Sequence, residues 1–169
     1  MLHYFALLLP SFVSSFWVIT MLSKTNIRPQ KIWIMTMFVI AISTFIWSVY
    51  FAGIQDYSLF YKLNIIETFT TLSFYPLVYL HLKSMLTDKP FGKKVYLLFL
   101  PAMITGGIIV FLYLAMGEKY AVQYIQTIIE SHGSSVALNA HIHKIHYVVS
   151  VYLYNLLIVI QTILLIIYI

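Results

Sequence analysis

Residues 72–101, LSFYPLVYLHLKSMLTDKPFGKKVYLLFLP, decide how this chain is organised. They hold an apolar helix interrupted by Pro76, a short lysine-rich linker, and the start of a second apolar helix at Val95. Four lysines and a single acid stand in or beside the linker: Lys83, Lys89, Lys93, Lys94 and Asp88. Because Lys and Arg collect on the cytoplasmic side of short membrane loops, this linker is the reference for the topology of the whole chain.

The composition of the 169 residues indicates a membrane protein. Hydrophobic residues make up 62% of the chain and charged residues 9%, and the mean hydropathy is +0.91. Soluble domains carry about 25% charged and about 45–50% apolar residues. A soluble chain of this length could not bury so much apolar surface, so the bilayer is the expected solvent.

The remaining global features exclude several protein classes. The formal net charge of +5 does not require a nucleic-acid partner, because the basic residues stand between apolar runs. The lack of cysteine excludes disulfides and cysteine-ligated metals. No basic segment precedes the first apolar run and no small-residue cleavage site follows it, so we interpret it as a retained helix and not a signal peptide.

The apolar runs predict an all-α fold, a single polytopic transmembrane helix bundle covering residues 1–169. A membrane-spanning helix needs about 20 mainly apolar residues. Five runs meet this requirement: residues 2–22, 32–52, 63–82, 95–116 and 147–169. Small residues at four-residue spacing predict close helix contacts in the first two spans: Ser11 with Ser15, and Thr44 with Ser48 and Ala52.

The loop of residues 117–146 is the one sizeable connection. Five apolar residues within it fall at helical spacing: Ala121, Val122, Ile125, Ile128 and Ile129. We therefore expect an amphipathic helix lying in the membrane interface and ending near Gly133. Ser134 or Ser135 is the expected N-cap of the following helix. The fifth span reaches Ile169 without a polar tail, so we expect the natural chain to continue beyond that residue.

The charges of the loops predict the orientation in a cell (inner) membrane. Seven of the ten basic residues lie in the first and third loops: Lys24, Arg28, Lys31, Lys83, Lys89, Lys93 and Lys94. Lys62, Lys119 and Lys144 lie in the second and fourth loops, with most of the acids. Loops one and three are therefore expected in the cytoplasm, with the N-terminus outside and the end of the fifth span inside.

Four histidines in or beside the large loop offer one candidate site: His132, His141, His143 and His146. His143 and His146 are three residues apart and can share a helical face, so a metal site is conceivable. The spacing matches no specific metal signature, no cysteine contributes, and Glu130 is the nearest acid. Histidines near an interface commonly serve as amphipathic side chains, and we assign no metal and no cofactor.

Polar residues inside the spans offer a second candidate. Glu67 is the one carboxylate within a span, and such a group suggests transport by default. Its expected place, about one turn from the outer end, would also let it reach the headgroups or pair with Lys62. Three polar residues of the fifth span could line a pocket or link helices: Asn155, Gln161 and Thr162. No nucleophile–base pair, phosphate loop or paired carboxylates point to an enzyme.

Three segments resemble a known family. Residues 75–84, YPLVYLHLKS, resemble the YPLLYLYIRSL segment of membrane-anchored AraC-type transcriptional regulators of bacteria. Phe91 and residues 98–101, LFLP, are similar to the basic linker and HFLP helix start of that family, although Leu98 stands where a histidine is usual. Residues 154–168 resemble the helix that precedes a basic cytoplasmic loop in those proteins.

The resemblance implies a sensory membrane domain whose DNA-binding helix-turn-helix module would follow Ile169. DNA would then be contacted only through that module, and the bilayer, a homodimer partner and an unknown ligand are the other expected partners. Pro76 and Pro101, on either side of the lysines, are the hinge candidates. Two alternatives stay open: the sensor domain of a membrane histidine kinase, and a small transporter or accessory membrane subunit.

Overall fold

The computed structural model describes residues 2–23, 27–52, 56–87, 91–131, 138 and 140–168, without the side chains of residues 2–5 and 168. The described residues are almost entirely helical and include no β-strand, which confirms the all-α prediction. In chain order the elements are α1 (Leu2–Leu22), α2 (Arg28–Phe51), α3 (Tyr57–Leu86), the 3₁₀-helix η1 (Lys93–Phe99), α4 (Leu100–Glu130), α5 (His141–Tyr147), the π-helical segment η3 (Val148–Leu153) and α6 (Tyr154–Tyr168).

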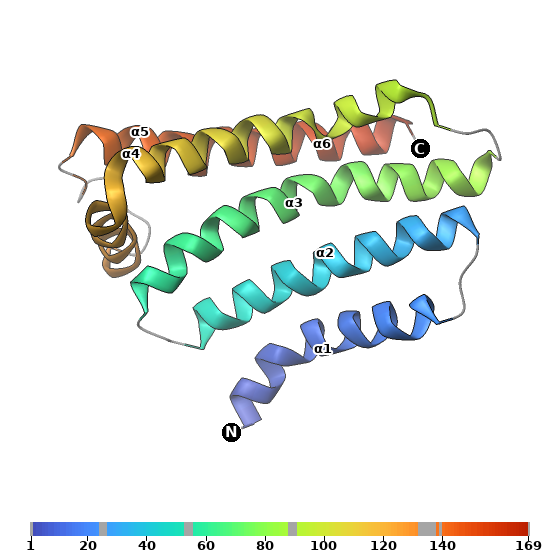
Figure 1. The fold of residues 1–169 in the computed structure, drawn as a ribbon, viewed down its shortest axis with the longest axis horizontal. Coiled ribbons are helices and arrows are strands. Elements are labelled where there is room, and N and C mark those ends of the chain that lie inside the picture. Colours follow the sequence, from blue (N-terminus) through green and yellow to red (C-terminus); the bar gives the residue numbers. More distant parts are fainter. Residues whose placement is uncertain are drawn as a thin grey trace.

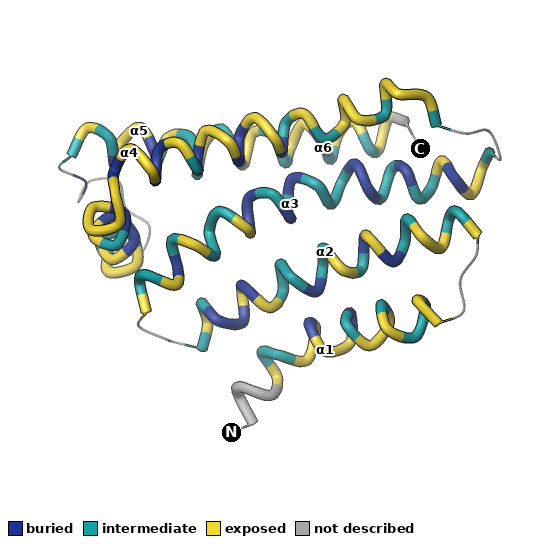
Figure 2. Tube along the Cα trace, viewed as in Figure 1, coloured by how far each residue is buried: buried dark blue, intermediate teal, exposed yellow. Residues whose placement is uncertain are grey.

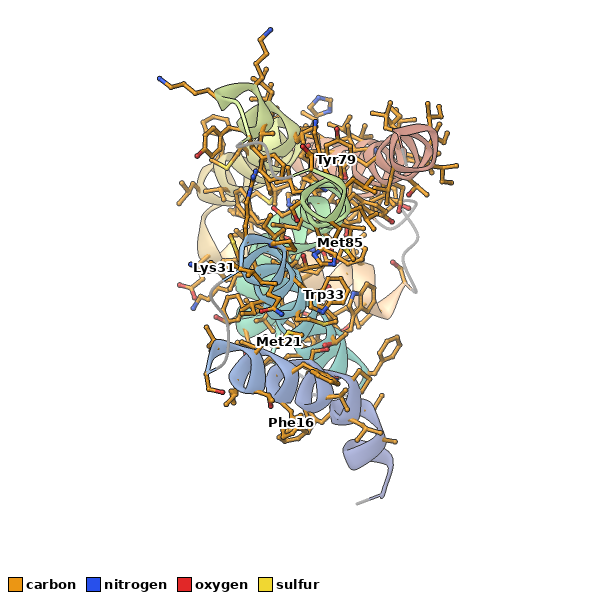
Figure 3. All side chains as sticks on the ribbon, turned by 90° about the vertical axis from the view of Figure 1, so that its right-hand side faces the viewer. Phe16, Met21, Lys31, Trp33, Tyr79 and Met85 are labelled. Atoms are coloured by element: carbon orange, nitrogen blue, oxygen red, sulfur yellow. The ribbon has the colours of Figure 1, made fainter. Side chains whose placement is uncertain are left out.

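The helices form a bundle with α3 at its centre. α1, α2 and α3 lie side by side in chain order, and α4 and α6 lie along the far side of α3 (Figure 1). Viewed from the end that holds the α1–α2 and α3–η1 connections, α1, α2 and α3 form a column with α4 and α6 next to each other above it (Figure 3). α3 therefore contacts α2, α4 and α6, which places its polar residues between helices.

Three helical stretches are long and apolar enough to cross a membrane: Arg28–Phe51, Lys93–Glu130 and His141–Ile167. The prediction of five such spans is therefore met in part. The described apolar part of α1, Ala6–Leu22, is shorter than a full span. α3 is long, but Glu67, Asn64 and several threonines lower its hydropathy. Its central position buries Glu67, Thr68 and Thr70 and half-buries Asn64.

The outward faces of the helices are apolar. Phe16, Phe111, Leu114 and Ile166 each expose more than 60% of their surface, and Phe16 projects from α1 away from the other helices (Figure 3). Exposed positions follow the outer sides of α1, α4 and α6, whereas the buried positions of α3 face its neighbours (Figure 2). Large exposed apolar surface marks a membrane or protein contact, and here it accompanies helices of membrane-spanning length.

The contact between α1 and α2 uses the small residues that the sequence singled out. Ser48 is buried and its hydroxyl donates to the Leu7 carbonyl of α1 at 2.5 Å. Ser11 is buried as well, while Ser15 is half-buried. Small side chains let two backbones approach, and the Ser48 bond then fixes their register.

The fourth helix differs from the prediction at both ends. Its first turns, Lys93–Phe99, are 3₁₀-helical, and the α-helix proper starts at Leu100. It continues past the expected end at Met116 to Glu130, interrupted by Gly117 at φ 71° and ψ 162°. A positive φ is readily adopted only by glycine, so this residue sets the break that turns the second half of α4 across the bundle (Figure 1).

The helix expected at residues 147–169 begins earlier, at His141, with Ala140 as its N-cap. Ser134 and Ser135, the expected N-cap residues, lie outside the described residues, as do His132 and Gly133. Residues 141–168 form one continuous helical stretch, because the π-helical turns of η3 join α5 to α6 without a break.

Candidate functional site

Glu67 is the centre of a buried polar cluster. It lies ten residues after Tyr57, the first residue of α3, or about 15 Å along the helix. Its side chain is only 7% exposed. Its Oε1 accepts hydrogen bonds from the Tyr154 hydroxyl of α6 at 2.9 Å and from the Thr71 hydroxyl at 3.0 Å. A carboxylate in this position is held by donors from two helices, and one of those helices is the last of the chain.

This placement overturns the expected surroundings of Glu67. The expectation was that Glu67 would reach the headgroups or pair with Lys62. Lys62 is exposed, and its ammonium lies 5.5 Å from the centre of the Tyr61 ring. The helix starts six residues before the predicted span, so Glu67 lies deeper in the bundle than its sequence position indicated.

A pocket of about 280 Å³ lies beside this carboxylate, and we call it the Glu67 pocket. Four elements line it: α2, α3, the second half of α4, and η3. Its lining consists of Trp47, Tyr50, Asn64, Glu67, Tyr124, Ile125, Ile128, Ile129, Ser150 and Val151. The pocket thus combines one carboxylate, three large aromatic rings and an apolar wall, with no lysine or arginine in its lining.

The pocket wall is fixed by hydrogen bonds between helices. The Tyr113 hydroxyl of α4 donates to Asn64 Oδ1 of α3 at 2.9 Å. The hydroxyls of Tyr124 and Ser150 lie 3.3 Å apart, which links the second half of α4 to η3. π-helical turns are rare and often occur at functional sites, and here Ser150 and Val151 of such a segment face the pocket.

The predicted histidine pair lies behind this wall. His143 and His146 share one face of α5 and are both buried, as their spacing predicted. The His146 ring lies 4.3 Å from the Tyr113 ring and 4.5 Å from the Tyr124 ring, measured between centroids. Both ring nitrogens of His146 and Nε2 of His143 have no hydrogen-bond partner among the described residues.

These imidazoles do not form a metal centre with the side chains around them. Within the described ranges no three His, Asp or Glu side chains come together. His141 is exposed and points elsewhere on the same short helix, and His132 lies outside the described residues. His143 and His146 are aromatic core residues whose rings pack at a tilt against those of Tyr113 and Tyr124.

A second pocket, of about 370 Å³, lies toward the other end of α3. It is lined by Tyr75, Pro76, Tyr79, Leu97, Leu98, Pro101, Gln161, Leu164 and Leu165. Both hinge candidates border it. All three segments that resemble the regulator family therefore meet at one place, although they are far apart in the sequence.

Pro76 has a defined effect in this region. Proline lacks an N–H, so the carbonyl four residues earlier, that of Leu72, loses its helical donor. The side chain of Gln161, on α6, supplies the replacement: its Nε2 donates to the Leu72 carbonyl at 3.3 Å. Of the three polar residues predicted to link helices, Asn155 and Thr162 donate instead to carbonyls of their own helix.

Pro101, expected near the entry of the fourth span, lies in the first turn of α4. A proline is tolerated there because the missing N–H would have no helical partner in any case. It marks the change from the 3₁₀-helix to the α-helix and does not itself remove a hydrogen bond from a long helix.

The basic residues of the first and third connections gather at one end of the bundle. The Arg28 guanidinium lies 3.5 Å from the centre of the Phe91 ring, and His81 Nδ1 lies 3.0 Å from the Pro29 carbonyl. Lys83 donates to the Tyr79 hydroxyl at 3.1 Å. Lys93 and Lys94 are exposed, and Lys89 lies outside the described residues.

The tyrosines are the site residues that sequence reasoning missed. Tyr50 of α2 and Tyr124 of α4 line the Glu67 pocket. Tyr154 of α6 donates to Glu67 itself, and Tyr113 of α4 donates to the neighbouring Asn64. The available signal was the total of 14 tyrosines in so apolar a chain, since a buried tyrosine usually needs a partner for its hydroxyl.

No protein-family model, curated protein or solved structure matches this chain.

Proposed function

We propose that this chain is the membrane-embedded sensory domain of a transcriptional regulator similar to the AraC-type membrane-anchored proteins. In this proposal five helices cross the cell membrane, the N-terminus is outside, and residues 118–130 lie at the outer interface. The regulator's DNA-binding module would follow α6 in the cytoplasm. The convergence of the three family-like segments around Pro76 and Pro101 supports this assignment.

The observation that supports a receptor role is the limited attachment of α6 to α3. α6 packs on α3 much less extensively than α2 and α4 do. Two hydrogen bonds join it to α3, one from Tyr154 to Glu67 and one from Gln161 to the Leu72 carbonyl. The first involves the carboxylate of the Glu67 pocket, so an occupant of that pocket acts directly on the attachment of the last helix.

A receptor needs two arrangements that a ligand binds with different affinity. A cationic ligand beside Glu67 weakens the carboxylate as an acceptor for the Tyr154 hydroxyl, whereas the contact at Gln161 is unchanged. That contact lies at the proline-freed carbonyl, where α3 is least constrained by its own backbone bonds. Release at one end and retention at the other give α6 two defined positions.

The test uses the full-length gene product in its own host. The gene is expected to encode a basic helix-turn-helix module in frame after this domain. Tyr154→Phe should alter the level of a limited set of transcripts at unchanged membrane abundance, and deletion of the module should abolish that change. A gene that ends without such a module, or transcripts that do not respond to Tyr154→Phe, would refute the proposal.

The buried Glu67 also favours a second candidate, a proton- or cation-coupled transporter, because ionisable groups inside membranes mark ion paths. Proteoliposomes loaded with a pH-sensitive dye separate the two functions. A transporter would give a proton flux that Glu67→Gln abolishes, whereas a receptor gives no flux in either form.

A further inference from the structure

We propose that the Glu67 pocket binds a small organic ammonium ion with an apolar substituent. This inference rests on the proposed receptor function, whose ligand it specifies by chemical class. It is drawn from the charge, the aromatic rings and the apolar wall of the pocket, each of which restricts the occupant independently.

The charge of the pocket calls for a cation. Glu67 is buried, and among the described residues no lysine or arginine pairs with it. Both hydrogen bonds that it accepts go to Oε1, while Oε2 accepts none from the described residues. A buried carboxylate without a counter-ion is costly, and a ligand cation next to Oε2 removes that cost.

The aromatic rings decide which kind of cation fits. Trp47, Tyr50 and Tyr124 line the same pocket as the carboxylate. The faces of such rings attract ammonium groups within about 6 Å, and clusters of them are used to bind organic ammonium ions. A metal ion is a poor occupant, because Ca²⁺ requires six to eight oxygen ligands and the described residues offer no cluster of three ligating side chains.

The rest of the lining gives the ligand its second feature. One wall of the pocket is apolar and consists of Ile125, Ile128, Ile129 and Val151. The three isoleucines belong to the part of α4 that follows the break at Gly117. The volume of about 280 Å³ is at the lower end of small-molecule sites. A primary ammonium ion that carries one ring or a short alkyl chain matches both the size and the polarity of the Glu67 pocket.

The test measures binding to the intact chain in phosphatidylcholine nanodiscs, whose zwitterionic lipid does not concentrate cations. The chain has three tryptophans, so Trp17→Phe with Trp33→Phe leaves Trp47 as the reporter in the pocket wall. Benzylammonium should quench the Trp47 fluorescence with saturation. Benzyl alcohol has the same shape without the charge and should give only the non-saturating change of partitioning into lipid.

Two substitutions test whether the binding depends on the Glu67 carboxylate. Glu67→Gln should raise the dissociation constant for benzylammonium at least about tenfold, as expected for loss of a charged hydrogen-bond partner. Glu118→Gln is the matched control, because Glu118 is an exposed carboxylate on α4, and it should leave the constant unchanged. Saturable quenching by both compounds, or binding unaffected by Glu67→Gln, would overturn the proposal. The comparison of the two compounds needs no substitution in the pocket, so it decides the question even if Glu67→Gln fails to fold.

Failure of the ligand class and failure of the receptor function are distinguishable. Transcripts that respond to Tyr154→Phe, together with no specific benzylammonium binding, would retain the receptor and reject the ammonium ligand. Specific binding without any transcript response would retain the ligand site and reject the regulator.

Discussion

The hydrogen bond from Tyr154 to Glu67 is one of the few polar contacts between α3 and α6. Tyr154→Phe removes one of two donors to Glu67 Oε1 and leaves the ring in place. Hydrogen bonds between membrane helices contribute about 0.6 kcal/mol on average and at most about 1.7 kcal/mol. We expect a loss near the upper value, because the acceptor is a buried carboxylate.

The measurement is reversible unfolding of the chain in mixed micelles. Tyr152→Phe is the control, since the Tyr152 side chain is 63% exposed, and it should change the free energy of unfolding by less than about 0.5 kcal/mol. Equal effects of the two substitutions would mean that the bond to Glu67 adds no stability.

Gly106 of α4 packs directly against the ring of Phe69 on α3. A Cβ on Gly106 would overlap the ring of Phe69, whereas a Cβ on the adjacent Gly107 would meet nothing within 4 Å. Gly106→Ala should therefore destabilise the bundle by about 1–3 kcal/mol through overpacking. Gly107→Ala should be neutral or slightly stabilising, because alanine favours the helix. Thermal unfolding of both variants checks this pair, and a neutral Gly106→Ala would show that the Phe69 ring moves aside at no cost.

At the scale of elements, Pro76 in α3 and Gln161 in α6 are coupled, because Gln161 supplies the hydrogen bond to Leu72 that Pro76 cannot make. Gln161→Leu should cost about 0.6–1.7 kcal/mol because the Leu72 carbonyl loses its donor. In a Pro76→Ala background the backbone N–H returns to that carbonyl, so the same substitution should cost less. A double-mutant cycle measured by unfolding gives the difference directly. Additive effects would mean that Gln161 and Pro76 act independently.

The packing of the second half of α4 predicts that two adjacent residues differ in their accessibility to water. Ile125 is buried against the protein core, and its neighbour Gln126 is exposed. Spin labels at these two positions should differ, with the label at residue 125 shielded from an aqueous relaxation agent and the label at residue 126 reached by it. Equal aqueous exposure would contradict the packing of this helix.

The same elements show what the sequence could predict and what it could not. The apolar stripe of residues 121–129 identified the amphipathic helix, because periodicity reports which face is buried. It could not tell that Ala121 and Ile125 pack on protein, since lipid and protein core are equally apolar. The contacts of Glu67 depend on the approach of α6 from 87 residues away, and no local pattern encodes such a partner.

Across the whole molecule, polarity decreases outward from α3. The carboxylate, the threonines and Asn64 of α3 face other helices, while the exposed sides of α1, α4 and α6 carry Phe, Leu and Ile. This distribution is the reverse of that in a soluble protein and fits a bundle whose solvent is lipid. Apart from Glu67, the charged residues of the described helices lie near helix ends, connections or the break at Gly117, where charges are expected to set the orientation.

The orientation is the last prediction. Both basic connections lie at the same end of the bundle, where Arg28 contacts Phe91 and His81 lies against Pro29. Positive residues of short loops stay in the cytoplasm, so this end should be internal and the Glu67 pocket should lie toward the opposite, external side. Alkaline phosphatase fused after Ser131 should therefore be active, and the same enzyme fused after Thr87 should be inactive. Replacing Lys83, Lys93 and Lys94 by glutamine should weaken this preference and raise the activity of the Thr87 fusion, whereas Lys119→Gln, at the other end, should not. Activity only at Thr87 in the unmodified chain would place the lysines outside and reverse the orientation of the pocket.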